Sequence, residues 1–474
     1  MRRASILSLT LAASLHAFAG TGKVVIVSID RPGVGFNDTT PVQPVGGNPG
    51  TTLGEQRMNV FNAAAATWSA YLDTNVDIIA QAQFTPIPPC TADSAVLGQA
   101  SPWSWRRDFT NAPQPNVWYP IALANKLAGR DLEPGTADIF AQFNSSLDDA
   151  NCLGASNWYY GLDGQHGIHN DLYLVVLHEL AHGLGISGNG RSPFFRDNIP
   201  AVSDLHTLDL TTGRRWDQMS EGERTASMTN TGKLVWDGET VRRNAYQYLE
   251  PAAKLTISEP ANVAREYRFG TAAFGPTPSG VSVSGNVAAA VDASTTDSPS
   301  TRDGCTAFSN AAAISGNIAL VDRGSCLFTI KAQNAQAAGA TAIIIVDNVA
   351  SACEQPPGMA GEAPDVTIPV ISVTQNDGAR LRAELNANNT VRGRLGRDTV
   401  DLAGTAQGYV RLYAPCVVEP GSSTHHWDDV STPNLLMEPS INSDLLHGLD
   451  LTVYQLLDIG WTRNPRSGRR IFTR

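Results

Sequence analysis

The sequence has few cysteines and no excess of positive charge. Only six of its 474 residues are Cys, and no two of them form a C-x-x-C pair, which argues against a cysteine zinc site or a redox motif. Lys and Arg number 34 against 45 Asp and Glu, a net charge of −11. Proteins that bind nucleic acid need a basic face to neutralise phosphates, so the charge argues against that class. No Walker A or G-x-S-x-G motif is present, so neither nucleotide hydrolysis nor serine hydrolysis is indicated.

Long apolar runs are also lacking after the first residues. At the start, two arginines precede the apolar segment Ala4 to Phe18, and Ala17-Phe18-Ala19 has the small–x–small pattern that signal peptidase cuts. A membrane-spanning helix needs about 18 consecutive apolar residues, and no later stretch reaches that length. The pattern predicts a signal peptide over residues 1–19 and no membrane span. We therefore expect a secreted protein, extracellular or, if the source is a Gram-negative bacterium, periplasmic.

All six cysteines lie after this segment. An even number in an exported chain indicates disulfide bonds. Sequence proximity, which is the only basis for pairing them, predicts the bonds Cys90–Cys152, Cys305–Cys326 and Cys353–Cys416.

The chain after the signal peptide changes in character twice. Residues 20–265 contain β-branched runs, a helical apolar pattern from residue 55 onward, and a segment over 86–118 with many prolines that we expect to be irregular. Over 266–397, strand-like and helical runs alternate, which predicts a separate α/β unit. Residues 398–474 contain paired histidines and a final helical stretch.

The clearest chemical signal is the motif His178-Glu179-Leu180-Ala181-His182. Residues four apart lie on one face of a helix, so His178 and His182 can place two imidazoles on one Zn²⁺. Glu179 then lies beside the metal, where its carboxylate can take a proton from water. The apolar run Leu172 to Leu177 predicts a buried helix, in which unliganded histidines and a glutamate would be costly. The motif therefore predicts a zinc site with Glu179 as the catalytic base.

A catalytic zinc ion usually has three protein ligands and one water. The motif and Gly185 resemble the metzincin clan of zinc peptidases, whose signature is H-E-x-x-H-x-x-G-x-x-H. This chain departs from the signature at its last position, where Gly188 cannot bind a metal. The third ligand must therefore come from another part of the chain.

The segment Thr424-His425-His426-Trp427, followed by Met437, resembles the third-ligand and Met-turn region of the leishmanolysin-like metzincins. In those enzymes an insertion separates the glycine from the third histidine. The resemblance implies His426 as the third ligand and Met437 as the Met-turn residue, which lies beneath the metal without binding it. Successive residues of an extended segment face opposite ways, so His425 is the alternative ligand rather than an additional one. His206 and His447 are more distant possibilities.

The segment Gly316 to Phe328, with Asp322-Arg323-Gly324, resembles the protease-associated (PA) domain, and Ala342 to Asn348 continues the resemblance. Such domains occur in secreted peptidases, carry no catalytic residues, and imply contacts with substrates or partner proteins. The resemblances together imply an α+β architecture. A metzincin-like catalytic domain with a mixed sheet and an active-site helix begins at residue 20, is interrupted by the PA domain over 266–397, and is completed by 398–474.

These features favour a secreted zinc-dependent endopeptidase that acts on proteins or peptides. A zinc aminopeptidase with a PA domain is one alternative, because His426-Trp427-Asp428 can also be an H-x-D metal motif. A secreted binding or adhesion protein with a structural or vestigial zinc site is the other, and Gly188 keeps it open. A fourth protein ligand would favour the binding protein, whereas an open coordination position would favour an enzyme.

Overall fold

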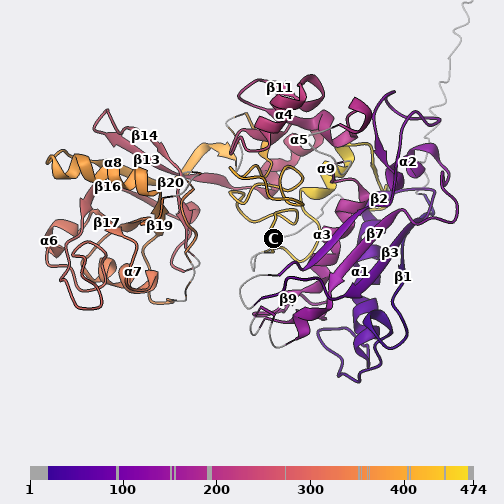
Figure 1. Ribbon diagram of the computed structural model, residues 1–474, viewed down its shortest axis with the longest axis horizontal. Helices are drawn as coiled ribbons and strands as arrows, with labels where there is room; N and C mark the ends of the chain where they lie inside the picture. The colour runs from indigo at the N-terminus through magenta and orange to yellow at the C-terminus, as the bar shows by residue number, and fades with distance from the viewer. Residues whose placement is uncertain are drawn as a thin grey trace, which may run out of the picture.

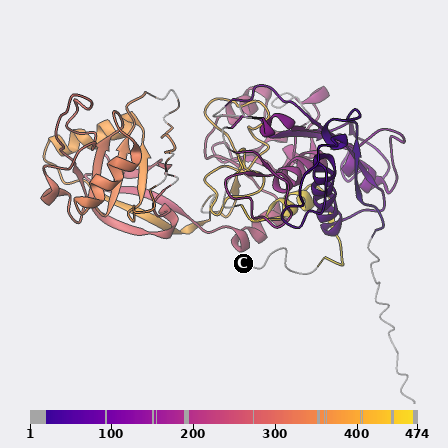
Figure 2. The same cartoon turned by 90° about the horizontal axis from the view of Figure 1, so that it is seen from below.

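The structure, a computed structural model, consists of two bodies joined by a pair of strands (Figures 1 and 2). The larger body contains the chain before residue 251 and after residue 402, and the smaller body contains the residues between. The residues described are 20–91, 95–149, 152–153, 156–188, 195–272, 274–350, 353, 355–359, 361, 363–402, 405, 407–441 and 445–467. The predicted signal peptide, residues 1–19, lies outside them. Within these ranges, no helix is both long and apolar enough to span a membrane.

The larger body contains a four-stranded sheet in the order β1-β3-β7-β4. Its strands are β1 (Val24–Ser28), β3 (Ile78–Thr85), β7 (Ile139–Asn144) and β4 (Gly98–Pro102). β1, β3 and β7 are parallel, and β4 pairs antiparallel with β7 at the sheet edge. The prediction that 86–118 is irregular is wrong at β4. Its sequence, GQASP, lacks β-branched residues, and only the pairing with β7 makes it a strand.

Two helices pack against this sheet, α1 (Leu53–Tyr71) and α3 (Leu172–Leu184). A capping box between Thr52 and Glu55 starts α1. Every residue of α3 is buried, and its motif histidines therefore lie inside the body. Gly183 lets α3 approach the sheet closely, because a Cβ at that position would lie 2.3 Å from Cγ2 of Ile139.

The remainder of the larger body joins the two distant stretches of chain. Its helices are α2 (Ile121–Ala128), α4 (Glu221–Ser227), α5 (Glu239–Tyr248) and α9 (Thr452–Asp458). A second sheet has the order β11 (Arg214–Arg215), β10 (Thr207–Asp209), β12 (Leu234–Trp236) and β21 (Val410–Arg411). Three two-stranded pairs complete it: β2 (Leu72–Asp73) with β22 (Thr462–Arg463), β5 (Trp105–Arg106) with β6 (Tyr119–Pro120), and β8 (Trp158–Tyr159) with β9 (Asn170–Asp171). Because β21 and β22 follow the inserted body and pair with strands that precede it, one hydrophobic core includes both stretches.

The smaller body is an eight-stranded sheet with helices on its two faces (Figure 1). In sheet order its strands are β14 (Arg265–Tyr267), β13 (Pro251–Glu259), β20 (Arg392–Leu402), β16 (Ser282–Ala289), β17 (Ile318–Asp322), β18 (Ala342–Val346), β19 (Val370–Val373) and β15 (Gly270–Thr271). The helices are α6 (Ala311–Ile314), α7 (Phe328–Ala337) and α8 (Gln375–Asn386). β16 to β19 are parallel and bury apolar side chains on both faces, as expected for the alternating pattern. β13 lies entirely before residue 266, where the unit was predicted to begin, and β20 continues past residue 397, where it was predicted to end.

Three disulfides are present, and their pairings are those predicted. Cys90–Cys152 lies in the larger body and Cys305–Cys326 in the smaller body. Cys353–Cys416 connects the two bodies, since Cys353 lies in the inserted residues and Cys416 follows β21. The smaller body is therefore attached to the larger body through the strands β13 and β20 and through one disulfide bond.

Candidate metal centre

Three histidines from two distant stretches of chain meet in the larger body. His178 and His182 come from α3, and His426 comes from the second stretch. The three Nε2 atoms lie 3.2 Å from one another in all three pairs. In the ranges that the structure describes, this is the only group of three or more His, Cys, Asp or Glu side chains able to hold one metal ion.

A turn held by backbone hydrogen bonds presents His426. The Tyr413 amide donates to the His426 carbonyl at 2.8 Å, and the Thr424 amide donates to the Tyr413 carbonyl at 2.7 Å. On the other side, the Trp427 amide donates to the carbonyl of Met437 at 2.7 Å, and the Trp427 ring is fully buried. Thr424 has φ +74°, a left-handed conformation that is uncommon for a β-branched residue. These contacts fix the backbone from which His426 reaches α3.

The second ring nitrogen of each histidine lies against a backbone carbonyl. Nδ1 is 2.7 Å from the Leu436 oxygen in His178, 2.6 Å from the Ile186 oxygen in His182, and 2.7 Å from the Ser422 oxygen in His426. A carbonyl can only accept, so each Nδ1 carries the proton and each Nε2 presents a lone pair. Burial, with the neighbouring His182 adding to it, lowers the pKa of His178 to about 3, which keeps that ring neutral.

Three lone pairs that face one another need a cation between them. Tetrahedral zinc with Zn–N bonds of 2.0–2.1 Å would separate its nitrogen ligands by about 3.3–3.4 Å. The observed separations of 3.2 Å are close to this value. Neutral imidazoles also suit Zn²⁺ as ligands. The three histidines therefore fit a zinc ion.

Glu179 lies beside the histidines and under the edge strand β4. It is buried, and burial raises the pKa of its carboxyl to about 8, while a hydrogen bond from the Ala100 amide of β4 opposes that rise. A Cβ at Gly98 would lie 3.0 Å from Cγ of Glu179 and 3.1 Å from Cδ1 of Phe143. Gly98 thus allows β4 to lie directly on the glutamate. Sequence reasoning missed Gly98 and Ala100, because no local pattern marks their segment as a strand.

The other predicted candidates have different surroundings. His425 is half-buried and does not belong to the group of three; burial, with the neighbouring His182 adding to it, lowers its pKa to about 4. Met437 is fully buried. The carbonyl of the residue before it, Leu436, accepts a hydrogen bond from Nδ1 of His178. His206 lies 3.6 Å from an oxygen of Asp237, and His447 lies 3.3 Å from an oxygen of Asp171. Neither of these last two histidines is in the group.

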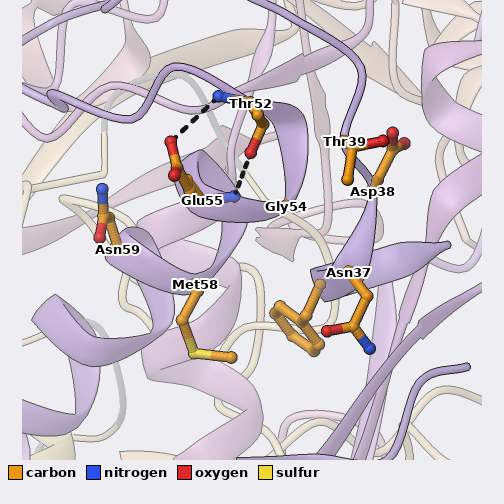
Figure 3. Close-up of a pocket in the computed structure, with 9 residues that line it drawn as sticks. Asn37, Asp38, Thr39, Thr52, Gly54, Glu55, Met58 and Asn59 are labelled. Carbon is orange, nitrogen blue, oxygen red and sulfur yellow. Dashed lines mark hydrogen bonds between the residues drawn. The ribbon is translucent and has the colours of Figure 1, made fainter. Parts of the chain in front are cut away.

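A hollow of about 400 Å³ lies elsewhere, at the start of α1 (Figure 3). Its lining includes the side chains of Asp38, Thr52, Glu55 and Met58. Thr52 and Glu55 already bond to each other's backbone in the capping box. No histidine lines the hollow, so it is separate from the metal centre.

Comparison with known proteins identifies a family within the smaller body. Residues 283–381 match the PA domain family. Over 105 residues the chain is 36% identical to Signal peptide peptidase-like 2 of Arabidopsis thaliana, which covers 22% of this chain and 19% of that protein. Over 112 residues it is 36% identical to the probable lipoprotein aminopeptidase LpqL of Mycobacterium tuberculosis. This match covers 24% of this chain and 20% of LpqL. The chain thus spans about a fifth of the length of these relatives, and it contains a PA domain.

Solved structures match this chain only at low similarity. A zinc aminopeptidase from Bacillus subtilis is 20% identical, with 42% of each chain covered and a TM-score of 0.21. A subtilisin-like protease from Pseudoalteromonas sp. AS-11 is 19% identical, with 37% of each chain covered and a TM-score of 0.23. None of the proteins named here is a metzincin, so the metzincin resemblance of the larger body stays a prediction.

Proposed function

We propose that this chain is a zinc-dependent peptidase whose metal is held by His178, His182 and His426. The observation that carries the proposal is the convergence of three Nε2 lone pairs beside the buried carboxylate of Glu179. When bound, zinc would supply Lewis-acid chemistry, which polarises a peptide carbonyl and lowers the pKa of water.

The protein groups around this centre have separate roles. The Glu179 carboxylate accepts a proton from the attacking water and later donates it to the leaving peptide nitrogen. A carboxyl whose pKa is raised by burial is a stronger base once ionised, and the Ala100 amide orients it. The carbonyls of Leu436, Ile186 and Ser422 hold the three rings with Nε2 toward the metal.

The ligand set favours an enzyme over a binding protein with a structural zinc. Structural zinc sites usually have four protein ligands, whereas catalytic sites have three and leave a position for water. The group found among the described residues has three. This supports catalysis.

Two modes of peptide cleavage are compatible with the centre. An endopeptidase is supported by β4, which lies at the edge of its sheet next to Glu179, where an extended peptide can add main-chain hydrogen bonds. An aminopeptidase is better supported by the names of the relatives, which include LpqL and the Bacillus subtilis zinc aminopeptidase. The match to LpqL covers only 20% of that protein, and the Bacillus subtilis structure is only 20% identical to this chain. The two modes of cleavage must therefore be separated by experiment.

The test is hydrolysis of a mixed peptide library, with both ends blocked or free, by the chain from Gly20 onward. Internal cleavage of blocked peptides would support an endopeptidase, and stepwise release from free amino ends would support an aminopeptidase. Glu179→Gln keeps the size of the side chain but removes the base, so we expect hydrolysis to fall by about 10²–10⁴-fold while zinc remains bound. Absence of cleavage by folded, zinc-loaded protein would contradict the proposal.

Export of the protein is part of this proposal. The predicted signal peptide and the three disulfides support it, because disulfides persist in oxidising compartments. Mass spectrometry of the protein recovered outside the cytoplasm should give a mature chain that begins at Gly20. We also propose that the PA domain contacts substrates or partner proteins.

A further inference from the structure

Two buried carboxylates hold the turn that contains Met437. Oε1 of Glu438 accepts from the Leu435 amide at 2.8 Å, and Oδ2 of Asp450 accepts from the Leu436 amide at 2.5 Å. Glu438 is 1% exposed and Asp450 is 4% exposed. A buried carboxylate is costly unless hydrogen bonds satisfy it. Each of these acids therefore depends on the backbone amides it binds, and the turn depends on the acids.

Asp450 is also anchored on its other side. Its Oδ1 accepts from the Thr452 amide at 2.9 Å and from the Thr452 hydroxyl at 2.6 Å. Thr452 is the first residue of α9 and is fully buried. Asp450 thus connects the start of a core helix to one amide of the turn, and hydrogen bonds to a carboxylate are stronger than those to a neutral acceptor.

The residue that Asp450 holds is the one that orients His178. The Leu436 amide binds Asp450, and the Leu436 carbonyl accepts from Nδ1 of His178 at 2.7 Å. The bond to Asp450 holds the peptide plane that precedes Leu436, and the Leu436 carbonyl extends from the end of that plane, so its position depends on Asp450. A group that fixes the Nδ1 partner of a metal-binding histidine also fixes the direction of its Nε2.

His178 differs in this respect from the other two histidines. Nδ1 of His182 binds the carbonyl of Ile186, and Nδ1 of His426 binds the carbonyl of Ser422, each only four residues away in the chain. The carbonyl bound by His178 is 258 residues away. Of the two histidines on α3, His178 is therefore the one whose orientation depends on how the second stretch of chain is anchored.

We propose that Asp450 is a positioning residue of the metal centre, which sets the direction of the His178 imidazole through Leu436. This inference rests on the proposed zinc-binding function. It assigns Asp450 an effect on the metal and not only on the stability of the fold.

The chain offers a matched control at the other end of α9. Asp458 also accepts three hydrogen bonds, from the Thr240 amide at 2.7 Å, the Val241 amide at 3.1 Å and Nε1 of Trp236 at 3.0 Å. It joins α9 to the start of α5, and none of its three donors bonds to a histidine of the centre. Asp458→Asn therefore removes a comparable interaction that is not bonded to any of the three histidines.

The experiment compares Asp450→Asn with Asp458→Asn in the chain from Gly20 onward. Zinc affinity is measured by competition with a chromophoric chelator, the ligand geometry by the visible absorption of the Co²⁺-loaded protein at saturating metal, and stability by chemical unfolding. In either variant an NH₂ group replaces one carboxylate oxygen and faces a donor, so at least one of the three hydrogen bonds is lost.

We expect both variants to lose stability, but only Asp450→Asn to lower zinc affinity, by about 10-fold or more, and to change the Co²⁺ spectrum. The inference is wrong if Asp450→Asn keeps the affinity and spectrum of the wild type, or if Asp458→Asn changes both equally. Should Asp450→Asn not fold, Thr452→Val removes only the hydroxyl donor to Asp450. An altered Co²⁺ spectrum in that variant supports the inference, and an unchanged spectrum overturns it.

The two proposals fail in different ways. A folded wild type that binds neither Zn²⁺ nor Co²⁺ would overturn the proposed function. A wild type that binds both, together with an Asp450→Asn variant that binds them identically, would overturn only the role of Asp450.

Discussion

The smaller body, called here the PA-domain body, and the larger body, called the histidine-bearing body, differ in how much of the chain each requires. The PA-domain body is one continuous stretch, and both of its apolar layers are made from residues within that stretch. The histidine-bearing body needs two stretches, and its main core combines residues such as Trp68 and Leu177 with Trp427 and Leu456. The proposed zinc ligands follow the same division, two before the insertion and one after it. The metal centre can therefore exist only when both stretches have assembled.

The connection between the bodies explains how an insertion can be so large without disturbing the centre. β13 leads into the smaller body and β20 leads out of it, and the two pair antiparallel with Pro251 opposite Leu402. The chain thus leaves and re-enters the larger body at neighbouring points (Figure 2). The insertion separates the ligands in sequence without separating them in space.

The largest effect is expected from removing the one proposed ligand that the second stretch supplies. We expect His426→Ala to abolish hydrolysis and to lower zinc affinity by about 100-fold or more, as much as His178→Ala does, because two imidazoles alone leave the site incomplete. Zinc content after dialysis and zinc titration would measure this. His206→Ala is the control, and it should bind zinc like the wild type. Full zinc occupancy in His426→Ala would mean that His425 or another group is the third ligand.

Removing the Cys353–Cys416 disulfide, which links the two bodies, tests how far the second stretch depends on the PA domain. Cys353→Ser with Cys416→Ser opens a bond between residues 63 apart, and we expect a loss of about 4 kcal/mol in the free energy of unfolding. Zinc should still bind, because the backbone hydrogen bonds of His426 with Tyr413 and of Trp427 with Met437 do not depend on this disulfide.

The matched control is Cys305→Ser with Cys326→Ser, which opens a bond of separation 21 inside the PA domain. We expect a loss of about 3 kcal/mol, confined to unfolding of that body. Chemical unfolding followed by near-ultraviolet circular dichroism would compare the pairs. Loss of zinc binding only after the Cys353–Cys416 bond is opened would show that the PA domain helps to hold the third ligand.

The surroundings of acidic side chains differ between the two bodies. Asp322 of the PA domain pairs with Arg382, whereas Asp204 of the larger body accepts only from the Ala201 amide among the described residues. Burial, with Asp217 adding to it, raises the pKa of Asp204 to about 7. Between the pKa of the unfolded chain, 3.8, and about 7, the folded state binds the extra proton, so stability falls as pH rises through this window.

The variant Asp204→Asn cannot titrate and isolates this effect. From about pH 5 to pH 8 the wild type should lose about 3 kcal/mol more of its unfolding free energy than the variant. Urea unfolding of both proteins at the two pH values would measure the difference. The same pH dependence in both would contradict the assignment.

The smallest predicted effect concerns the edge strand above Glu179. In Gly98→Ala the new methyl group would press on the glutamate and on Phe143, so we expect kcat/KM to fall by about 10-fold while the protein remains folded and zinc-bound. Gly222→Ala in α4 is the control, since nothing lies within 4 Å of its added Cβ. It should leave the activity unchanged, and equal effects in the two variants would argue against a special role for Gly98.

Local spacing in the sequence was sufficient for several features. Four residues is slightly more than one helical turn, so the positions of His178 and His182 already imply that their imidazoles share a face. The PA domain was recognisable because its strands and helices follow one another along the chain. Proximity in sequence also predicted all three disulfides.

Other features depend on contacts between segments that the sequence does not relate. β4 is a strand only because β7 pairs with it. The approach of His426 to His178, 248 residues away, requires the Thr424 turn and its hydrogen bonds with Tyr413. The path from Asp450 through Leu436 to His178 likewise joins parts of the chain that share no motif.

Local motifs and helical spacing therefore predicted the helix, two of the three proposed ligands, the proposed base Glu179 and the inserted domain. Which histidine completes the group of three, and which carbonyls orient the rings, depends on how the distant segments fold together. The physical reason is the range of the interactions: helical periodicity acts within a few residues, whereas the meeting of distant segments is set by packing of the core and by the buried hydrogen bonds that the packing permits.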